Sequence, residues 1–206
     1  MRPSRRSGSK GAHLSCFVLL VVCAAWLNAC GGLGSTTAFH AKNISGVMPP
    51  LEFSLIGEHG ATLTAGGLRG KTILLYFGYT SCPDVCPTTL ANLAQALRRL
   101  GPAAESVRVL FVSVDPQRDS PQVLSRYAAA FGPQVIGLTG TDDQLTALTK
   151  RYRVAYRRDP PNAEGDYVVY HSSAVFVFDR DGNARLLTTP GETNDQLAED
   201  LRAVMG

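Results

Sequence analysis

Apolar residues follow two patterns along the chain, and together these predict an alternation of strands and helices. A continuous apolar run at 72–77 is typical of a strand that a sheet buries on both faces, and the mostly apolar stretch 107–114 predicts a second buried strand. Shorter runs that predict further strands lie at 135–138, 167–170, 173–178 and 184–188. Between the strands, apolar residues spaced three or four positions apart predict amphipathic helices. This order is typical of an α/β domain in which helices cover a central sheet.

Start signals fix the positions of four helices. We expect the first helix to begin near Pro87, because proline suits the first helical turn, and Ser120 to cap the second. Capping boxes, in which a Thr precedes a Gln by three positions, open the last two helices at 141–144 and 193–196.

Turn residues predict two hairpins and one long loop. The runs 51–55 and 61–63 flank a turn that contains two glycines, which predicts an N-terminal β-hairpin. The pair Asp181-Gly182 predicts a second hairpin before the last strand. The polar stretch 157–166 contains two consecutive prolines, and we expect it to be an exposed loop.

The first 30 residues have the pattern of a targeting segment. They carry four basic residues and no acidic residue, and an apolar run occupies 14–27. That run is short for a membrane-spanning helix and suits a secretory signal. The residues around Cys30 resemble a bacterial lipobox, in which Cys30 would be lipidated; the alternative is an uncleaved N-terminal anchor. Both interpretations place the rest of the chain outside the cytoplasm (on the periplasmic side), at a membrane surface.

Composition divides the remainder into a tether and one domain. Residues 31–48 are rich in Gly, Ser, Thr and Ala without apolar periodicity, which predicts a flexible tether. Residues 49–206 then form the α/β domain. Subtracting the four N-terminal basic residues from 20 leaves 16, against 17 acidic residues. This balance gives no sign of the basic face that nucleic-acid binding needs, so we expect no nucleic-acid partner.

Two cysteines of the domain are the candidate reactive groups. Cys16 and Cys23 fall in the apolar N-terminal run and Cys30 is the lipidation candidate, which leaves Cys82 and Cys86. In an oxidising compartment, two thiols this close can form a disulfide, a metal site, or each in turn. A purely structural disulfide is disfavoured, because closing so short a loop restrains the unfolded chain little.

Both cysteines lie between a predicted strand and a predicted helix. Pro83 and Pro87 follow them directly and disfavour helical backbone at Cys82 and Cys86. We therefore expect Cys86 at the N-cap, where unpaired N–H groups and the helix dipole favour thiolates. A dithiol on the first strand-to-helix turn, followed by this order of elements, is the thioredoxin-like pattern: a central mixed sheet flanked by helices.

His171 is the third candidate residue, because a thioredoxin-like domain packs the loop at this position against its dithiol. A redox thioredoxin usually has a cis-proline there, whereas this chain has Tyr170-His171-Ser172-Ser173. An imidazole opposite two thiols favours metal capture over general disulfide exchange. Two thiolates and one imidazole form a soft donor set that suits Cu(I), and Cu(II) with a further ligand. Zinc would need a fourth protein donor, and none is obvious.

Asp115 and Asp119 are weaker candidates. They follow the strand at 107–114, at the sheet edge where the sites of α/β proteins collect. They could orient the site or supply an oxygen ligand, and they could equally cap a local turn.

The chain resembles the Sco/SenC family of copper-binding proteins over residues 46–204. The motifs that carry this resemblance are LRGK at 68–71, FGYTSCPDVCP at 77–87, VDPQRD at 114–119, LTG at 138–140 and His171-Ser172. The resemblance implies a membrane-tethered chaperone that assists assembly of the dinuclear copper centre of cytochrome c oxidase. It would deliver copper to an oxidase subunit, keep that subunit's cysteines reduced, or both, and an upstream donor would load it. By position Cys82, Cys86 and His171 would be the copper ligands, and Tyr170 stands where family members often have Asp.

The alternative is an enzyme, a thiol–disulfide oxidoreductase or peroxidase-like protein. Cys82 or Cys86 would attack as a thiolate, and its neighbour would resolve the mixed disulfide. His171 would then only tune the rate, whereas a copper site requires it. The missing proline argues against a general oxidoreductase and leaves room for a reductase dedicated to one oxidase subunit.

Overall fold

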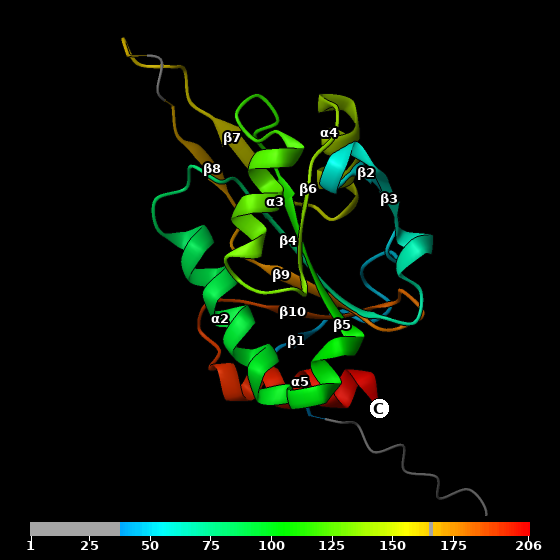
Figure 1. The fold of residues 1–206 in the computed structure, drawn as a ribbon. Helices are drawn as coiled ribbons and strands as arrows, with labels where there is room; N and C mark the ends of the chain where they lie inside the picture. Colours follow the sequence, from blue (N-terminus) through cyan, green and yellow to red (C-terminus); the bar gives the residue numbers. More distant parts are fainter. Residues whose placement is uncertain (1–37, 165–166) are drawn as a thin grey trace, which may run out of the picture. The chain divides into compact units, whose positions relative to one another are not determined.

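The computed structural model describes residues 38–164 and 167–206, which form one compact unit (Figure 1). The predicted signal segment, Cys30 and the first part of the predicted tether lie outside these described residues. Within them, no helix combines the length and the apolar character that crossing a membrane requires.

A six-stranded mixed sheet forms the centre of the unit, in the order β1-β10-β9-β4-β5-β6. Its strands are β1 (Lys42–Asn43), β4 (Thr72–Gly78), β5 (Val107–Ser113), β6 (Val135–Leu138), β9 (Val175–Phe178) and β10 (Ala184–Thr188). The strands β4, β5 and β6 are parallel, while β9 runs antiparallel to β4 and continues into β10 as a hairpin. All seven residues of β4 are buried, as its continuous apolar sequence predicts.

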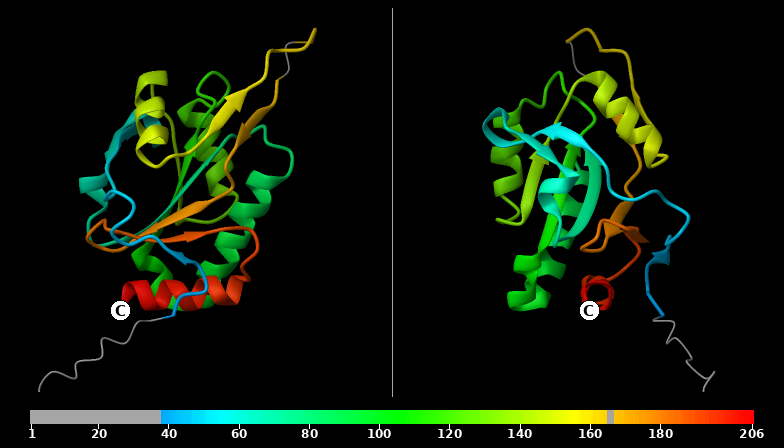
Figure 2. Two further views of the ribbon diagram at one scale, coloured as in Figure 1. Left: turned by 180° about the vertical axis from the view of Figure 1, so that it is seen from behind. Right: turned by 90° about the vertical axis from the view of Figure 1, so that its right-hand side faces the viewer.

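Four helices cover the sheet: α2 (Val85–Leu100), α3 (Pro121–Ala129), α4 (Asp142–Arg151) and α5 (Asn194–Met205). Helices α2 and α3 lie on one side and α4 on the other, and α5 packs against α2 (Figure 2). The cap at Ser120 and the capping boxes at Thr141 and Thr193 are confirmed by side-chain hydrogen bonds to backbone N–H groups.

Two small antiparallel sheets lie outside the central one. The predicted N-terminal hairpin is confirmed as β2 (Ser54–Ile56) and β3 (Thr62–Thr64). The second small sheet pairs β7 (Tyr156–Arg158) with β8 (Val169–His171). The expected loop at 157–166 is therefore wrong at its start, because two of its residues, Arg157 and Arg158, belong to a strand that pairs with β8.

The expected tether is wrong for residues 38–48. The short strand β1 pairs with β10, and Ala41 and Ile44 beside it are buried. The carboxylate of Asp200 on α5 accepts hydrogen bonds from the backbone N–H groups of His40, at 3.0 Å, and Ala41, at 2.8 Å. A strand of two residues is too short to show periodicity, and its buried acceptor lies about 160 positions away in the sequence.

Candidate metal centre

Both cysteines of the described residues lie where the chain passes from β4 into α2. Cys82 lies in the loop, and α2 begins at Val85 with Cys86 in its first turn. The predicted helix start near Pro87 is two residues late, and Asp84 rather than Cys86 is the N-cap.

Proline is compatible with this start. Pro87 is the third residue of α2, where a backbone N–H would have no intrahelical acceptor in any case. The first helical hydrogen bond runs from the Thr88 N–H to the Asp84 carbonyl, at 3.1 Å. Cys86 is completely buried, and this burial outweighs the preference for extended backbone before proline.

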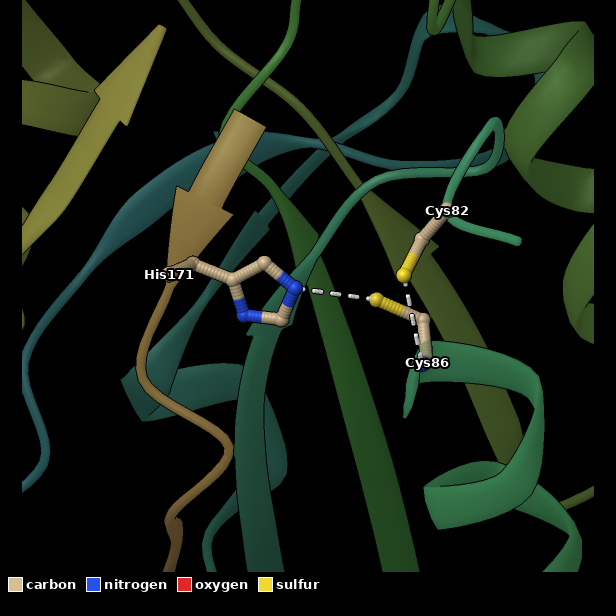
Figure 3. Close-up of side chains that lie close together, drawn as sticks. All are labelled: Cys82, Cys86 and His171. Atoms are coloured by element: carbon tan, nitrogen blue, oxygen red, sulfur yellow. Dashed lines mark hydrogen bonds between the residues drawn. The ribbon is translucent and has the colours of Figure 1, made fainter. Parts of the chain in front are cut away.

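The two thiols lie side by side, Cys82 on the loop and Cys86 at the start of α2 (Figure 3). Cys86 is fully buried and Cys82 is 8% exposed. The backbone N–H of Cys86 donates a hydrogen bond to the Cys82 sulfur, at 3.4 Å. Both side chains are free thiols in this structure, so the disulfide between them stays a prediction.

His171 ends β8 and directs its ring at the Cys86 sulfur (Figure 3). Its Nε2 lies 3.1 Å from the Cys86 Sγ, and its Nδ1 lies 3.0 Å from the Ser172 carbonyl oxygen. A carbonyl can only accept, so Nδ1 carries the proton and Nε2 carries a lone pair. The Cys86 S–H therefore donates to Nε2. The rings of Tyr76 and Tyr79 flank the imidazole, with centroids at 6.1 and 5.8 Å.

Burial sets the charge of these groups in the metal-free site. It raises the pKa of the Cys86 thiol to about 12, against a smaller opposing effect of the Tyr79 backbone N–H. Burial also lowers the pKa of His171. The expectation that the helix N-terminus makes Cys86 a thiolate is therefore wrong for the metal-free site. The metal-free groups are thus a neutral thiol and a neutral imidazole. A metal ion that binds both would displace the thiol proton.

The three residues fit a soft metal ion. Their ligand atoms all lie within 4.8 Å of one another, and this cluster contains no fourth His, Cys, Asp or Glu among the described residues. Two sulfurs and one imidazole nitrogen match the donors that Cu(I) prefers, whereas a structural zinc site normally has four protein ligands.

A groove of about 300 Å³ opens in front of the cluster, between the Cys82 loop and β8. Cys82 and His171 line it, whereas Cys86 does not. Val85, Val168 and Tyr170 stand at its sides with more than a third of their surfaces exposed. The sulfur of Cys82 is thus the one that an incoming molecule meets first.

Asp119 holds the cysteine loop in place. It is fully buried, and its carboxylate accepts hydrogen bonds from the Thr80 N–H at 3.0 Å, the Thr80 hydroxyl at 2.6 Å and the Ser113 hydroxyl at 2.6 Å. It lies outside the cluster of candidate ligands. These hydrogen bonds suit a residue that orients the cysteine loop, and both roles that the sequence left open stay predictions.

Asp115 holds a different part of the site. Its buried carboxylate pairs with Arg118 and accepts a hydrogen bond from the Tyr167 hydroxyl at 2.7 Å. The Arg118 guanidinium lies 3.8 Å from the centroid of the Tyr167 ring. Asp115 therefore fixes the segment that leads into β8 and His171, and it is not itself part of the ligand cluster.

Two residues have roles at the site that the sequence alone does not indicate. Gly78 leaves room for the Cys86 sulfur, and Tyr76 lies beside His171. Tyr76 was predicted only as part of an apolar strand, and nothing in a single sequence distinguishes it from other buried aromatic residues.

Comparison with known proteins identifies relatives of this chain. Residues 48–206 match the family model described as SCO1/SenC. A cattle protein named SCO2 homolog, mitochondrial, is 36% identical over 156 residues, which cover 75% of this chain and 59% of the cattle protein. The chain thus spans about 60% of the length of the curated mitochondrial relatives that it matches.

Solved structures confirm the thioredoxin-like α/β fold. Copper-bound ScoI of Bradyrhizobium japonicum is 35% identical with a TM-score of 0.70, and the match covers 76% of this chain and 99% of that one. Apo Sco1 of Thermus thermophilus is 37% identical with a TM-score of 0.74, covering 84% of this chain and 100% of that one.

Proposed function

The chain belongs to the SCO1/SenC family, and from this premise we propose that it is a copper metallochaperone that works outside the cytoplasm. It binds one copper ion through Cys82, Cys86 and His171. It passes the ion to the subunit of cytochrome c oxidase that holds the dinuclear copper centre, after an upstream donor has loaded it. The observation that carries this proposal is the cluster of two sulfurs and one imidazole within 4.8 Å.

The chemistry of the donor set supports copper as the cargo. Thiolates select Cu(I), and an imidazole whose other nitrogen is hydrogen-bonded is held in the tautomer that a metal needs. The hydrogen bond from His171 Nδ1 to the Ser172 carbonyl supplies that condition. The copper-bound ScoI structure of Bradyrhizobium japonicum supports the same assignment by similarity.

The groove supports transfer by ligand exchange. Cys82 lines the groove and Cys86 lies behind it, fully buried. A thiolate of the acceptor can therefore replace Cys82 first, while Cys86 and His171 still hold the ion. Release of Cys86 then completes the transfer, and its thiol regains a proton because burial favours the neutral form.

Attachment to a membrane is the second part of the proposal. The segment that would carry it, with Cys30 as a lipidated residue or as part of an uncleaved anchor, lies outside the described residues. It would hold the domain at the periplasmic face of a membrane, where an oxidase subunit is assembled.

A thiol–disulfide reductase that acts on the same oxidase subunit is the second candidate. The placement of the Cys82 thiol in the groove and of the Cys86 thiol directly behind it favours this hypothesis. The Cys82 thiolate would attack an acceptor disulfide, and Cys86 would then attack the mixed disulfide. The acceptor would gain two electrons and two thiols, while the chain would form the Cys82–Cys86 disulfide.

A Cu(I) titration tests the first candidate against the second. Three reduced proteins, each beginning at residue 31, compete with a chromophoric chelator for Cu(I). They are the wild type, His171→Ala and His40→Ala. We expect one copper per chain, an affinity at least about tenfold lower in His171→Ala, and no change in His40→Ala, whose imidazole pairs with Glu199 on α5. A copper affinity that ignores His171 would contradict the three-ligand site and favour the reductase.

A further inference from the structure

One buried hydroxyl beside the site has no partner. Tyr76 is fully buried in β4, and its hydroxyl makes no hydrogen bond of normal geometry. A hydroxyl taken out of water without a partner is destabilising, and buried polar groups in proteins are nearly always paired. The Tyr76 hydroxyl therefore needs an explanation.

The surroundings of this hydroxyl point to the metal centre. The Tyr76 side chain lies against Cys86 and Thr89 of α2, and its ring centroid is 6.1 Å from that of His171. In the metal-free site the Cys86 sulfur that it faces is a thiol, which is a weak acceptor, and the hydroxyl makes no hydrogen bond of normal geometry to Cys86 or to Thr89. The Cys86 thiol in turn uses its proton for His171.

Metal binding changes what Cys86 can accept. When the Cys86 sulfur and the His171 Nε2 both bind a metal ion, the hydrogen bond between these two atoms is lost. The Cys86 sulfur is then a thiolate. Hydrogen bonds to charged acceptors are shorter and stronger than those between neutral groups. The Cys82 sulfur already has a donor, the backbone N–H of Cys86 at 3.4 Å, and Tyr76 offers a corresponding donor to the second sulfur.

We propose that Tyr76 is a positioning residue of the copper site, whose hydroxyl donates a hydrogen bond to the metal-bound sulfur of Cys86. This role rests on the copper binding proposed above. It makes Cys86 the sulfur that the protein retains longest, and it leaves Cys82, at the groove, as the one that exchanges first.

The test compares Tyr76→Phe with Tyr127→Phe in the full reduced chain. Tyr127 is the matched control because its hydroxyl is also buried without a partner, while its ring packs on Phe111 and Phe131 rather than on His171. We measure urea unfolding of the metal-free chain, Cu(I) affinity by chelator competition, and the sulfur-to-Cu(II) charge-transfer band of the Cu(II)-loaded chain.

Neither variant should lower the stability of the metal-free chain, because each removes an unpaired hydroxyl. Tyr76→Phe should weaken Cu(I) binding about tenfold and move the charge-transfer band to lower energy, and Tyr127→Phe should do neither. Equal affinity and an unmoved band in both variants would overturn the role of Tyr76 while leaving copper binding intact. Loss of metal-free stability in Tyr76→Phe alone would also overturn it, since the hydroxyl would then be bonded before metal arrives. A wild-type chain that takes up no copper would instead refute the proposed function.

Discussion

Gly78 and Cys86 approach so closely that no side chain fits between them. A Cβ added at Gly78 would lie 2.8 Å from the Cys86 sulfur and 2.5 Å from a ring carbon of Phe111. The end of β4 and the first turn of α2 are therefore in direct contact. The absence of a side chain at Gly78 fixes the depth at which the Cys86 sulfur is buried.

Gly78→Ala should consequently damage both stability and metal binding. Overpacking of this kind typically destabilises a protein by about 1–3 kcal/mol, and a displaced Cys86 sulfur should weaken Cu(I) binding at least about tenfold. Urea unfolding and chelator competition measure the two effects. Gly191→Ala is the control, because nothing lies within 4 Å of its added Cβ, and it should change neither. A Gly78→Ala chain with wild-type copper affinity would show that Cys86 is not held by this contact.

Asp119→Asn should loosen the cysteine loop. In the wild type, both oxygens of the Asp119 carboxylate accept hydrogen bonds from Thr80 and Ser113. The asparagine amide keeps one oxygen and replaces the other with an NH2 group, which cannot accept them. Loss of hydrogen bonds to a buried charge destabilises by about 1.5–3 kcal/mol, and copper affinity should fall with it.

The matched change is Asp195→Asn, whose side chain is 71% exposed in its pair with Arg99. It should alter unfolding by less than about 0.5 kcal/mol and leave copper affinity unchanged. If Asp119→Asn affects stability but not copper affinity, the loop position does not depend on Thr80.

The metal-free domain should lose stability at alkaline pH through Cys86. Burial raises the pKa of this thiol to about 12, so the folded state keeps a proton that the unfolded chain releases near its ordinary thiol pKa. The stabilisation is complete below that ordinary value and falls as pH rises toward 12. Urea unfolding of wild type and Cys86→Ala at about pH 8 to 11 measures it, and the wild type should show the steeper decline. Parallel declines would mean that Cys86 ionises as readily in the folded chain as in the unfolded one.

Asp200→Ala should release the N-terminal strand from α5. The backbone N–H groups of His40 and Ala41 would lose a buried acceptor, which we expect to destabilise the domain by about 1–3 kcal/mol. Amide exchange at Ala41 and Ile44 should increase and report the loss directly. Glu199→Gln changes an exposed neighbour on the same helix and should leave exchange at both amides as it is.

The sequence predicts most of the central fold because its signals are local. The buried strands β4 and β5 are mostly apolar stretches of the sequence, and the capping boxes at Thr141 and Thr193 are spacings of three residues. The three-residue cluster was also predictable, because the cysteines follow a buried strand and the position of His171 follows from the order of elements.

The remaining features depend on contacts between distant residues. β1 exists because Asp200 and β10 bind it, and β7 exists because β8 pairs with it. The preference for extended backbone before proline takes no account of burial. It therefore does not predict the start of α2 at Val85, where Cys86 is fully buried. The unpaired hydroxyl of Tyr76 becomes visible only when its neighbours are known.

The binding of residues 38–48 to the domain shortens the distance over which the site can travel. Seven residues, 31–37, separate Cys30 from the described domain, and any chain of seven residues spans at most roughly 25 Å. A free stretch of the eighteen residues 31–48 would span at most roughly 65 Å on the same rule. If Cys30 is the membrane attachment proposed above, the copper site stays within a thin layer above the bilayer, and an acceptor would have to present its copper-binding residues close to the lipid surface.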